Sequence, residues 1–185
     1  MPFTKLLPTS IDLAQNFAFT GSVSGAGGIT VADNWRLNSS VSYLVGQNFL
    51  TSNWEQNDTT GFTNLGTSLT QSSGVFSFPS TGIYLISYTF YATLENDELG
   101  SRALIAVTTD NSNFTNVSFG SFGIQRSSGN YEFTSMCHTL FDVTNTSNCK
   151  VKFGYDAHTG PPTSIVNGST NNNRTNFIAV RLGDT

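Results

Sequence analysis

The amino-acid sequence predicts an all-β protein arranged as a sandwich or jelly roll. Asn, Ser and Thr make up 67 of the 185 residues, whereas Ala, Glu, Lys and Met together supply 18, so strong helix formers are scarce. The 15 Phe and 6 Tyr residues favour half-buried strands, and 17 Gly residues allow tight turns between them. From about residue 47 onward, short apolar runs alternate with clusters of Gly, Pro, Asn and Ser, which is typical of such folds.

The first 49 residues differ from the rest of the chain. Between residues 16 and 25 every second position is apolar or Gly, with Phe17, Phe19 and Val23 on one face of an expected strand. One strand cannot bury such a face alone, and the Gly-rich stretch at 25–28 then forms a flexible joint. We therefore expect residues 1–49 to be an extended anchoring and assembly segment, followed by a head domain over residues 50–185.

The clearest strand spans residues 82–92. Its even positions form a continuous apolar face, made by Tyr84, Ile86, Tyr88 and Phe90. Its odd positions are partly apolar as well, through Ile83, Leu85 and Tyr91. Because only one face of a strand meets the core of a two-layer sandwich, the second face is expected to pack against another copy of the chain.

The same alternation predicts further strands at 102–109, 113–119, 131–143, 149–155 and 176–182. In the strand at 149–155, Cys149, Val151, Phe153 and Tyr155 share one face, and the lysines at 150 and 152 indicate that the other face is exposed to solvent. The connection at 156–175 is rich in Gly, Pro and Asn, and loops of this length are usually functional or disordered.

The two cysteines lie on strands expected to neighbour each other. A mirror hairpin around the turn at 144–148 places Cys137 opposite Tyr155 rather than opposite Cys149. Free, buried thiols are therefore favoured, and a disulfide between Cys137 and Cys149 is the less favoured alternative.

No catalytic or metal-binding constellation emerges from the residues. His138 and His158 are the two candidate bases, and neither lies in a hydrolase motif, so both are expected to be packed or solvated. Adjacent strand residues point to opposite faces, which argues against zinc binding by Cys137 with His138. We expect neither an enzyme nor a cofactor.

Calcium is a separate alternative at an acidic tract. Glu95, Asp97 and Glu98 offer hard oxygen ligands, but such a run is more often a solvated turn. Whether calcium binds there stays open on the sequence.

The charge balance and hydropathy exclude two classes of partner. The chain has 8 Lys and Arg against 12 Asp and Glu, a net charge of −4, without a basic run, so nucleic acid is not an expected partner. No segment reaches the roughly 20 apolar residues that span a bilayer, and the amino terminus lacks the features of a signal peptide. Synthesis in a cytoplasm and no membrane contact are expected.

Two segments of the head carry a family resemblance. Residues 75–88 read VFSFPSTGIYLISY, and this run of Phe, Pro, Gly, Ile and Tyr resembles a signature of the complement globular-head and tumour-necrosis-factor superfamily. Residues 175–183, TNFIAVRLG, resemble the terminal strand of that family. The resemblance covers residues 50–185 and implies a jelly roll that assembles as a homotrimer, with Tyr84, Tyr88 and Phe90 in the core or near the threefold axis.

The amino-terminal segment carries a second resemblance. Residues 6–13 and 17–25 resemble the short anchoring segments of bacteriophage fibre and virion-surface proteins, whereas a collagen-like stalk is absent from the sequence. This implies a virion-surface protein, made in the host cytoplasm, that contacts other virion proteins through this segment.

Taken together, these observations predict a non-enzymatic trimeric structural protein of a bacteriophage, as a capsid decoration, a fibre or a tail-fibre knob. A host glycan is an expected partner of the long loop region, through amides and an aromatic platform: Tyr155, His158, Asn171, Asn172 and Asn173. The alternatives are a secreted complement-like binding protein and a carbohydrate-active enzyme on a jelly-roll scaffold.

Overall fold

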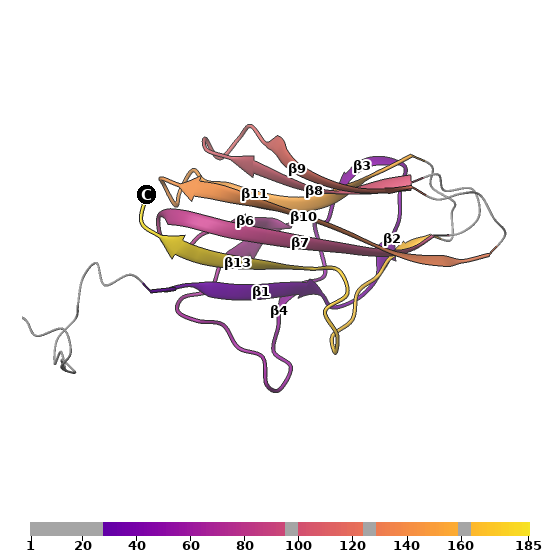
Figure 1. Cartoon of the computed structure of the whole chain (residues 1–185), viewed down its shortest axis with the longest axis horizontal. Coiled ribbons are helices and arrows are strands. Elements are labelled where there is room, and N and C mark those ends of the chain that lie inside the picture. The colour runs from indigo at the N-terminus through magenta and orange to yellow at the C-terminus, as the bar shows by residue number, and fades with distance from the viewer. Residues whose placement is uncertain (1–27, 95–99, 124–128, 159–163) are drawn as a thin grey trace, which may run out of the picture.

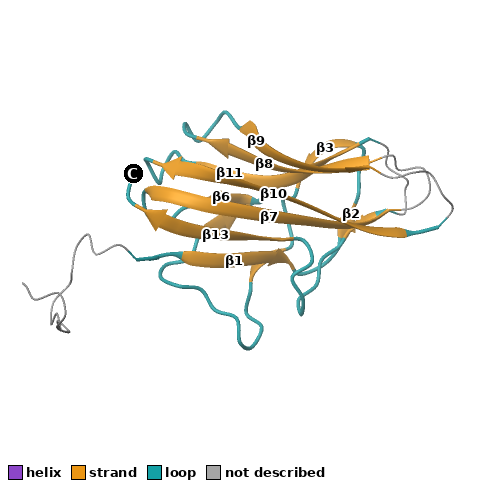
Figure 2. Ribbon diagram, viewed as in Figure 1, coloured by secondary structure: helices purple, strands orange, loops and turns teal. Residues whose placement is uncertain are grey.

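The computed structural model describes residues 28–94, 100–123, 129–158 and 164–185, and this part of the chain is all-β without a helix. The strands are β1 (Ala32–Leu37), β2 (Val41–Ser42), β3 (Gly46–Phe49), β4 (Trp54–Gln56), β5 (Thr70–Ser72), β6 (Val75–Ser77), β7 (Gly82–Leu94), β8 (Gly100–Thr108), β9 (Thr115–Gly123), β10 (Tyr131–Val143), β11 (Lys150–Ala157), β12 (Ile165–Val166) and β13 (Asn176–Gly183). In Figures 1 and 2 the longer strands, among them β7, β8, β11 and β13, lie side by side along the long axis of the molecule.

The strands form two antiparallel sheets. Sheet A has the order β2-β12-β7-β13-β1-β4, with β10 on the other side of β7. Sheet B has the order β5-β6-β11-β8-β9, with β3 also paired to β11. The two sheets pack face to face, and the all-β sandwich predicted from the composition is confirmed.

The long strand β7 forms the centre of sheet A. It pairs along its whole length with β10, from Gly82 opposite Val143 to Leu94 opposite Tyr131. Its even positions point into the sandwich, and Tyr84, Tyr88 and Phe90 are fully buried there. The alternation in the sequence therefore predicts the inner face of this strand correctly.

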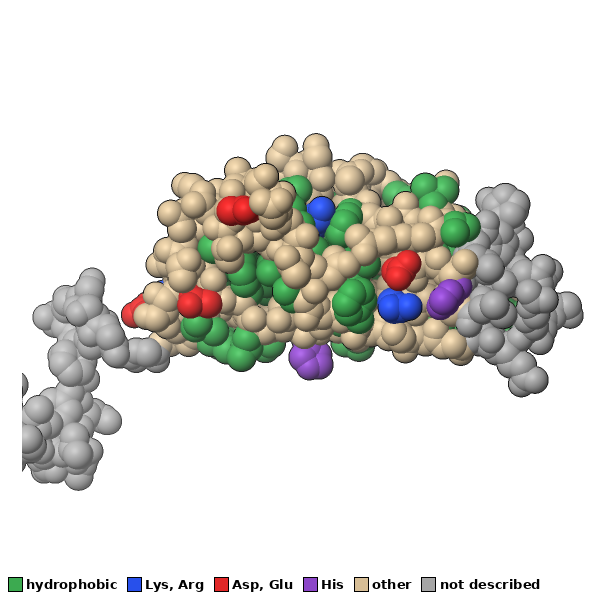
Figure 3. Space-filling view, turned by 90° about the horizontal axis from the view of Figure 1, so that it is seen from above, with side chains coloured by type: hydrophobic (Ala, Val, Ile, Leu, Met, Phe, Trp, Pro, Cys, Tyr) green, Lys and Arg blue, Asp and Glu red, His purple; other side chains and the backbone are tan. Residues whose placement is uncertain are grey.

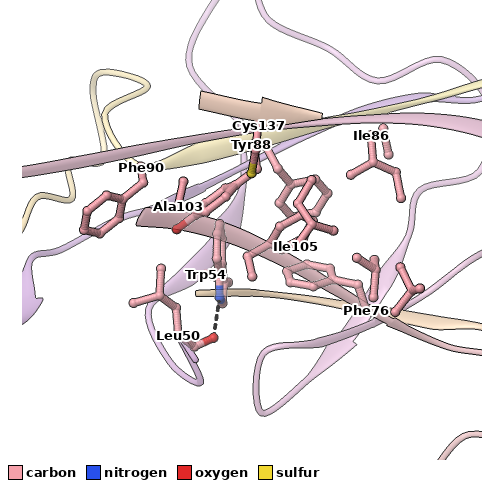
Figure 4. Packing of buried hydrophobic residues seen from close by; sticks show 14 of the residues in the cluster. Leu50, Trp54, Phe76, Ile86, Tyr88, Phe90, Ala103, Ile105 and Cys137 are labelled. Atoms are coloured by element: carbon pink, nitrogen blue, oxygen red, sulfur yellow. Dashed lines mark hydrogen bonds between the residues drawn. The ribbon is translucent and has the colours of Figure 1, made fainter. Parts of the chain in front are cut away.

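The core between the sheets is largely aromatic (Figure 4). Phe76 of sheet B lies at its centre, with its ring centroid 4.6 Å from that of Phe177 and 5.4 Å from that of Trp54. The indole of Trp54 donates a hydrogen bond to the backbone oxygen of Leu50 at 2.8 Å, so this polar group is satisfied inside the core. Edge-to-face ring contacts of this kind stabilise a core beyond their buried area.

The predicted hairpin between the strands of Cys137 and Cys149 is wrong. Strand β10 pairs with β7 in sheet A, whereas β11 pairs with β8, β6 and β3 in sheet B. The turn at 144–149 carries the chain from one sheet to the other, and Cys137 faces Tyr88 across the strand pair instead of Tyr155. The alternation of apolar residues along two consecutive strands does not show whether these strands pair as a hairpin or belong to different sheets, because the chain reverses its direction in both cases.

The amino-terminal part of the chain contributes strands to the sandwich. Of the segment 1–49, the structure describes residues 28–49, which include β1 next to β13, β2 next to β12 and β3 next to β11. The sandwich therefore includes residues on both sides of position 50. Residues 1–27, with Phe17, Phe19 and Val23, lie outside the described residues.

The sandwich is closed along the edge where β9 meets β10. A Cβ atom at Gly120 would lie 2.0 Å from the backbone oxygen of Met136. The two strands therefore approach more closely than a residue with a side chain at position 120 would allow. The hydroxyl of Ser118 donates a hydrogen bond to the backbone oxygen of His138 at 2.9 Å. Strand β10 is therefore covered along its outer edge by β9, which limits pairing with a further strand.

A buried arginine joins the loops beside β1. Arg36 is 1% exposed, and its guanidinium donates to Glu55 at 2.8 Å, to Asp58 at 3.1 Å and to Asn57 at 3.0 Å. It also donates to the backbone oxygen of Thr170, in the loop before β13. One side chain thus holds the β4 end and the 168–175 loop in a fixed arrangement.

Three asparagines extend this network. The amide of Asn57 donates to Asn34 at 2.9 Å and to Asn173 at 2.8 Å, and Asn173 donates to Asn34 at 2.9 Å. Asn173 therefore fixes the loop before β13 through its own side chain.

We expect Phe76→Ala to lower the free energy of unfolding by about 3–5 kcal/mol, because it leaves a cavity between Trp54 and Phe177. Chemical denaturation followed by tryptophan fluorescence measures this loss. The control Phe62→Ala removes a ring that is 54% exposed and should change stability by less than about 0.5 kcal/mol. Equal losses for the two variants would contradict the placement of Phe76.

We expect Arg36→Met to lower the free energy of unfolding by about 3 kcal/mol, because it leaves Glu55 and the amide oxygen of Asn57 without their cation. Denaturant titration measures the change. Arg174→Met, which removes an exposed arginine, serves as the control and should shift stability by less than about 0.5 kcal/mol. A loss below about 1 kcal/mol for Arg36→Met would show that the network contributes little.

Candidate functional site

The outer face of sheet A carries a group of exposed apolar side chains from three neighbouring strands. They are Leu85 of β7 (37% exposed), Met136 and Leu140 of β10 (60% and 62%), and Ile178 and Leu182 of β13 (44% and 48%). We call this group the sheet A patch. Large apolar side chains gathered on one surface of a soluble domain mark an interaction site.

The register shows that these side chains form adjoining rows. Leu140 lies opposite Leu85, and Leu85 lies opposite Val180. In the neighbouring row, Ser87 lies between His138 and Ile178. Cross-strand neighbours on one face are close enough to touch, so the row of Leu140, Leu85 and Val180 carries the patch across β10, β7 and β13, whereas Ser87 separates the side chains of the neighbouring row.

The patch is poor in charge. His138 lies within it, exposed, and Asp142 lies toward the end of β10 opposite Ile83. In the side view of Figure 3, green hydrophobic side chains follow one long border of the molecule on both sides of a histidine. A surface of this composition is suited to packing against another apolar surface.

The aromatic residues assigned to the core or the axis lie in the core of one subunit. Tyr84, Tyr88 and Phe90 are each 0% exposed and point away from the sheet A patch. The hydroxyl of Tyr88 has no hydrogen-bond partner among the described residues, and burial raises the pKa of Tyr88 well above its usual value. These rings stabilise the sandwich. The opposite face of β7, which includes Leu85, is the face that stays exposed on the subunit.

The sequence predicts Tyr155 at the receptor loop, and this prediction is wrong because Tyr155 lies in the core. Its ring is 1% exposed and stacks on Tyr43, with centroids 4.9 Å apart, and on Phe90 at 5.2 Å. Its hydroxyl accepts a hydrogen bond from the backbone N–H of Leu44 at 2.8 Å. Tyr155 therefore belongs to the core, because it shares the inward parity of β11, and it offers no open ring face to a ligand.

The other loop residues are exposed but do not form one site. His158 follows the end of β11, and its backbone N–H donates to Gly100 at 3.3 Å. Asn171, Asn172 and Asn173 lie in the loop before β13, where Asn173 is held by the network of Arg36. A glycan contact at this loop stays a prediction.

Cys137 lies on β10 of sheet A, Cys149 lies just before β11 of sheet B, and both cysteines are free and buried. Burial raises the pKa of the Cys137 thiol to about 11, so it is protonated at neutral pH. The favoured interpretation of free, buried thiols agrees with this arrangement.

The calcium alternative concerned Glu95, Asp97 and Glu98, which lie outside the described residues. Within the part of the chain that the structure describes, no three His, Cys, Asp or Glu side chains gather in a metal-binding arrangement. The same described ranges contain no helix long and apolar enough to cross a bilayer.

Comparisons by sequence find no relatives: no protein-family model and no curated protein matches the chain. Comparison by structure finds clear likenesses. The Eiger TNF structure from S. frugiperda superposes with a TM-score of 0.61 at 12% identity, covering 85% of this chain and 96% of that one.

Two structures of murine APRIL give similar results. The crystal structure at pH 8.5 has a TM-score of 0.56 at 9% identity, and that at pH 8.0 has a TM-score of 0.56 at 10% identity. Both alignments cover 82% of this chain and 98% of the APRIL chain. At this level of identity the likeness establishes the fold, and it confirms that the described part of the chain is a jelly roll of the tumour-necrosis-factor type.

Proposed function

We propose that this protein is a non-enzymatic structural protein that works as a homotrimer. The observation that carries the proposal is the sheet A patch, which leaves five large apolar side chains exposed on a single subunit. Burying each of them fully would contribute on the order of 1–2 kcal/mol, enough together to hold subunits in contact. The tumour-necrosis-factor type of fold supports the threefold arrangement.

Two different parts of the patch allow a head-to-tail contact between subunits. The side chains of Met136 and Leu140 lie on β10 at the margin of sheet A, while Leu85 and Ile178 lie further in, on β7 and β13. If the margin of one subunit packs on the inner strands of the next, the contact is heterologous, and such contacts form closed rings when the rotation between subunits allows it. The number three is proposed from the type of fold. The cover of β9 over β10 favours packing by side chains over pairing of strand edges.

In the proposed function the two histidines need no catalytic role. Among the described residues, neither the His138 nor the His158 imidazole is hydrogen bonded to a serine or cysteine side chain, as a nucleophile and its base would be. His138 lies within the sheet A patch, where the proposed assembly covers it.

For the biological setting, we propose display on the surface of a bacteriophage particle. The support is the resemblance of residues 6–13 and 17–25 to virion anchoring segments, together with a head that is a closed sandwich from residue 32 onward. In this role the amino-terminal segment binds other virion proteins and the head faces outward, where its surface contacts a glycan of the host. Three heads on one particle site would raise the avidity of such a contact.

Light scattering of the purified chain tests the assembly. We expect a mass of roughly three times 19.9 kDa, and Leu140→Glu should shift it to the mass of one chain, because three carboxylates cannot be buried in an apolar contact. Leu44→Glu is the matched control, since Leu44 is 57% exposed and outside the patch, and it should remain a trimer. A wild-type monomer at micromolar concentration, or a trimeric Leu140→Glu variant, would refute the proposal.

Deletion of residues 1–27 tests the anchor. The described strands all remain in the shortened chain, so we expect the same oligomeric mass and the same thermal midpoint as for the full chain. Attachment to bacteriophage particles that lack the protein should be lost, as measured by co-sedimentation, while the full chain attaches. Retained attachment of the shortened chain would show that the head, and not the amino-terminal segment, contacts the particle.

A further inference from the structure

The outer face of sheet B differs from the sheet A patch because it combines aromatic rings with positive charge. Its centre is Lys152 of β11, whose ammonium nitrogen lies 3.8 Å from the ring centroid of Phe49 and 4.2 Å from that of Phe114. The two rings come from segments far apart in the chain, β3 and the residues before β9. Cation–π contacts on both sides hold the ammonium in one place.

These rings cover a second apolar layer. Leu104 and Ala106 point outward from β8, away from the main core, and yet both are 0% exposed. The absence of a side chain at Gly154 lets β3 approach β11 closely, since a Cβ there would lie 2.2 Å from the backbone oxygen of Asn48 and 3.0 Å from the Phe49 ring. A supported surface of this kind is rigid, which lowers the entropy loss on binding.

One further ring on the same face is open to solvent. Phe119 of β9 is 48% exposed and lies opposite Leu104, which in turn lies opposite Gly154. Phe119 and Gly154 are therefore two strands apart, about 10 Å by the usual spacing of strands. Beside this row, the side chains of Asn116 and Gln47 are joined by a hydrogen bond of 2.7 Å.

The charge of this face is positive in an otherwise acidic chain. On the outer side of β8 and β11 the charged residues are Arg102, Lys150, Lys152 and Asp156, and Asp156 lies directly opposite Arg102. Lys150 and Lys152 lie opposite the uncharged Thr108 and Ala106 on β8, so the positive charge is concentrated at these two lysines. The chain as a whole has a net charge of −4.

The ammonium of Lys152 has no carboxylate partner in the described part of the chain. The salt bridges there involve Arg36 and Arg181, whose carboxylate partners are Glu55, Asp58 and Asp184. Partial burial lowers the pKa of Lys152 from its usual value, as expected for a cation that has lost water without gaining an anion. An anionic ligand would supply the missing partner.

We propose that the outer face of sheet B binds an acidic saccharide. A sugar carboxylate pairs with Lys152, and the apolar C–H face of a sugar ring in the same chain packs on Phe119. The combination of flat aromatic surface, amides and only three cations suits a carboxylated sugar, whereas a nucleic acid would require a longer track of positive charge.

This inference names the class of ligand for the host-surface contact in the proposed function, and it rests on that proposal for the biological source of the saccharide. The binding surface itself lies within one subunit and on the sheet opposite to the sheet A patch. Binding and assembly can therefore fail independently, and each can be measured without the other.

Isothermal titration calorimetry with a tetramer of galacturonic acid tests the proposal on the full chain. We expect saturable binding that weakens with added salt and that is lost with the methyl-esterified tetramer, which has the same sugar ring but no charge. Lys152→Met keeps the apolar stem next to its cross-strand neighbour Ala106 and should weaken binding about tenfold, as loss of one charge-assisted contact does. Phe119→Ser should weaken binding by a similar factor, about tenfold.

Arg174→Gln is the matched control, because Arg174 is an exposed cation near Tyr91 of sheet A, and it should bind as the wild type does. The Leu140→Glu variant, expected to be monomeric, should bind with the wild-type affinity per subunit. Absence of binding at millimolar tetramer, equal binding of the methyl ester, equal binding of a tetra-aspartate peptide, or unchanged affinity of Lys152→Met would each overturn the proposal. A monomeric wild type that binds the tetramer would refute the assembly and leave the saccharide site standing.

Discussion

Ring-to-ring packing between β7 and β13 of sheet A and β11 of sheet B holds the two layers of this protein together. The centroids of Phe153 and Phe177 are 4.1 Å apart, and those of Phe90 and Tyr155 are 5.2 Å apart, so the layers meet through direct aromatic contact. Because these side chains alternate along their strands, filling the core with every second residue determines which residues face outward. The properties of both outer faces follow from this inner packing.

The two outer faces have different compositions and therefore different proposed uses. On sheet A the large exposed side chains of β7, β10 and β13 are apolar, with the carboxylates of Glu132 and Asp142 toward the two ends of β10, as expected for a surface that other subunits cover in the proposed assembly. On sheet B the outward positions of β8 and β11 carry cations among rings, as expected for a surface that stays in contact with solvent. An assembly through sheet A leaves sheet B free, so subunit contact and ligand binding do not compete for the same surface.

The candidate sites were only partly accessible from the sequence. The second apolar face of the strand at 82–92 was evident from its alternation, and the structure places part of the sheet A patch there. Tyr155 was predicted at a ligand loop, although it shares the face of Phe153 in the alternating pattern of its strand and should therefore point into the core. This shared face was the signal in the sequence that could have corrected the prediction. The Lys152 site could not be found, because Phe49 and Phe114 are more than sixty residues apart in sequence and meet only after β3 joins sheet B.

The sequence by itself determined the all-β class, most of the long strands and the residues of each strand that face inward, since a strand repeats every two residues and this period is local. Only the tertiary structure decided that β10 and β11 belong to different sheets, that residues 32–49 complete both sheets, and that Arg36 and Asn173 join one loop to another. Strand pairing and side-chain networks depend on contacts between distant parts of the chain, and local alternation carries no information about which distant strands will meet.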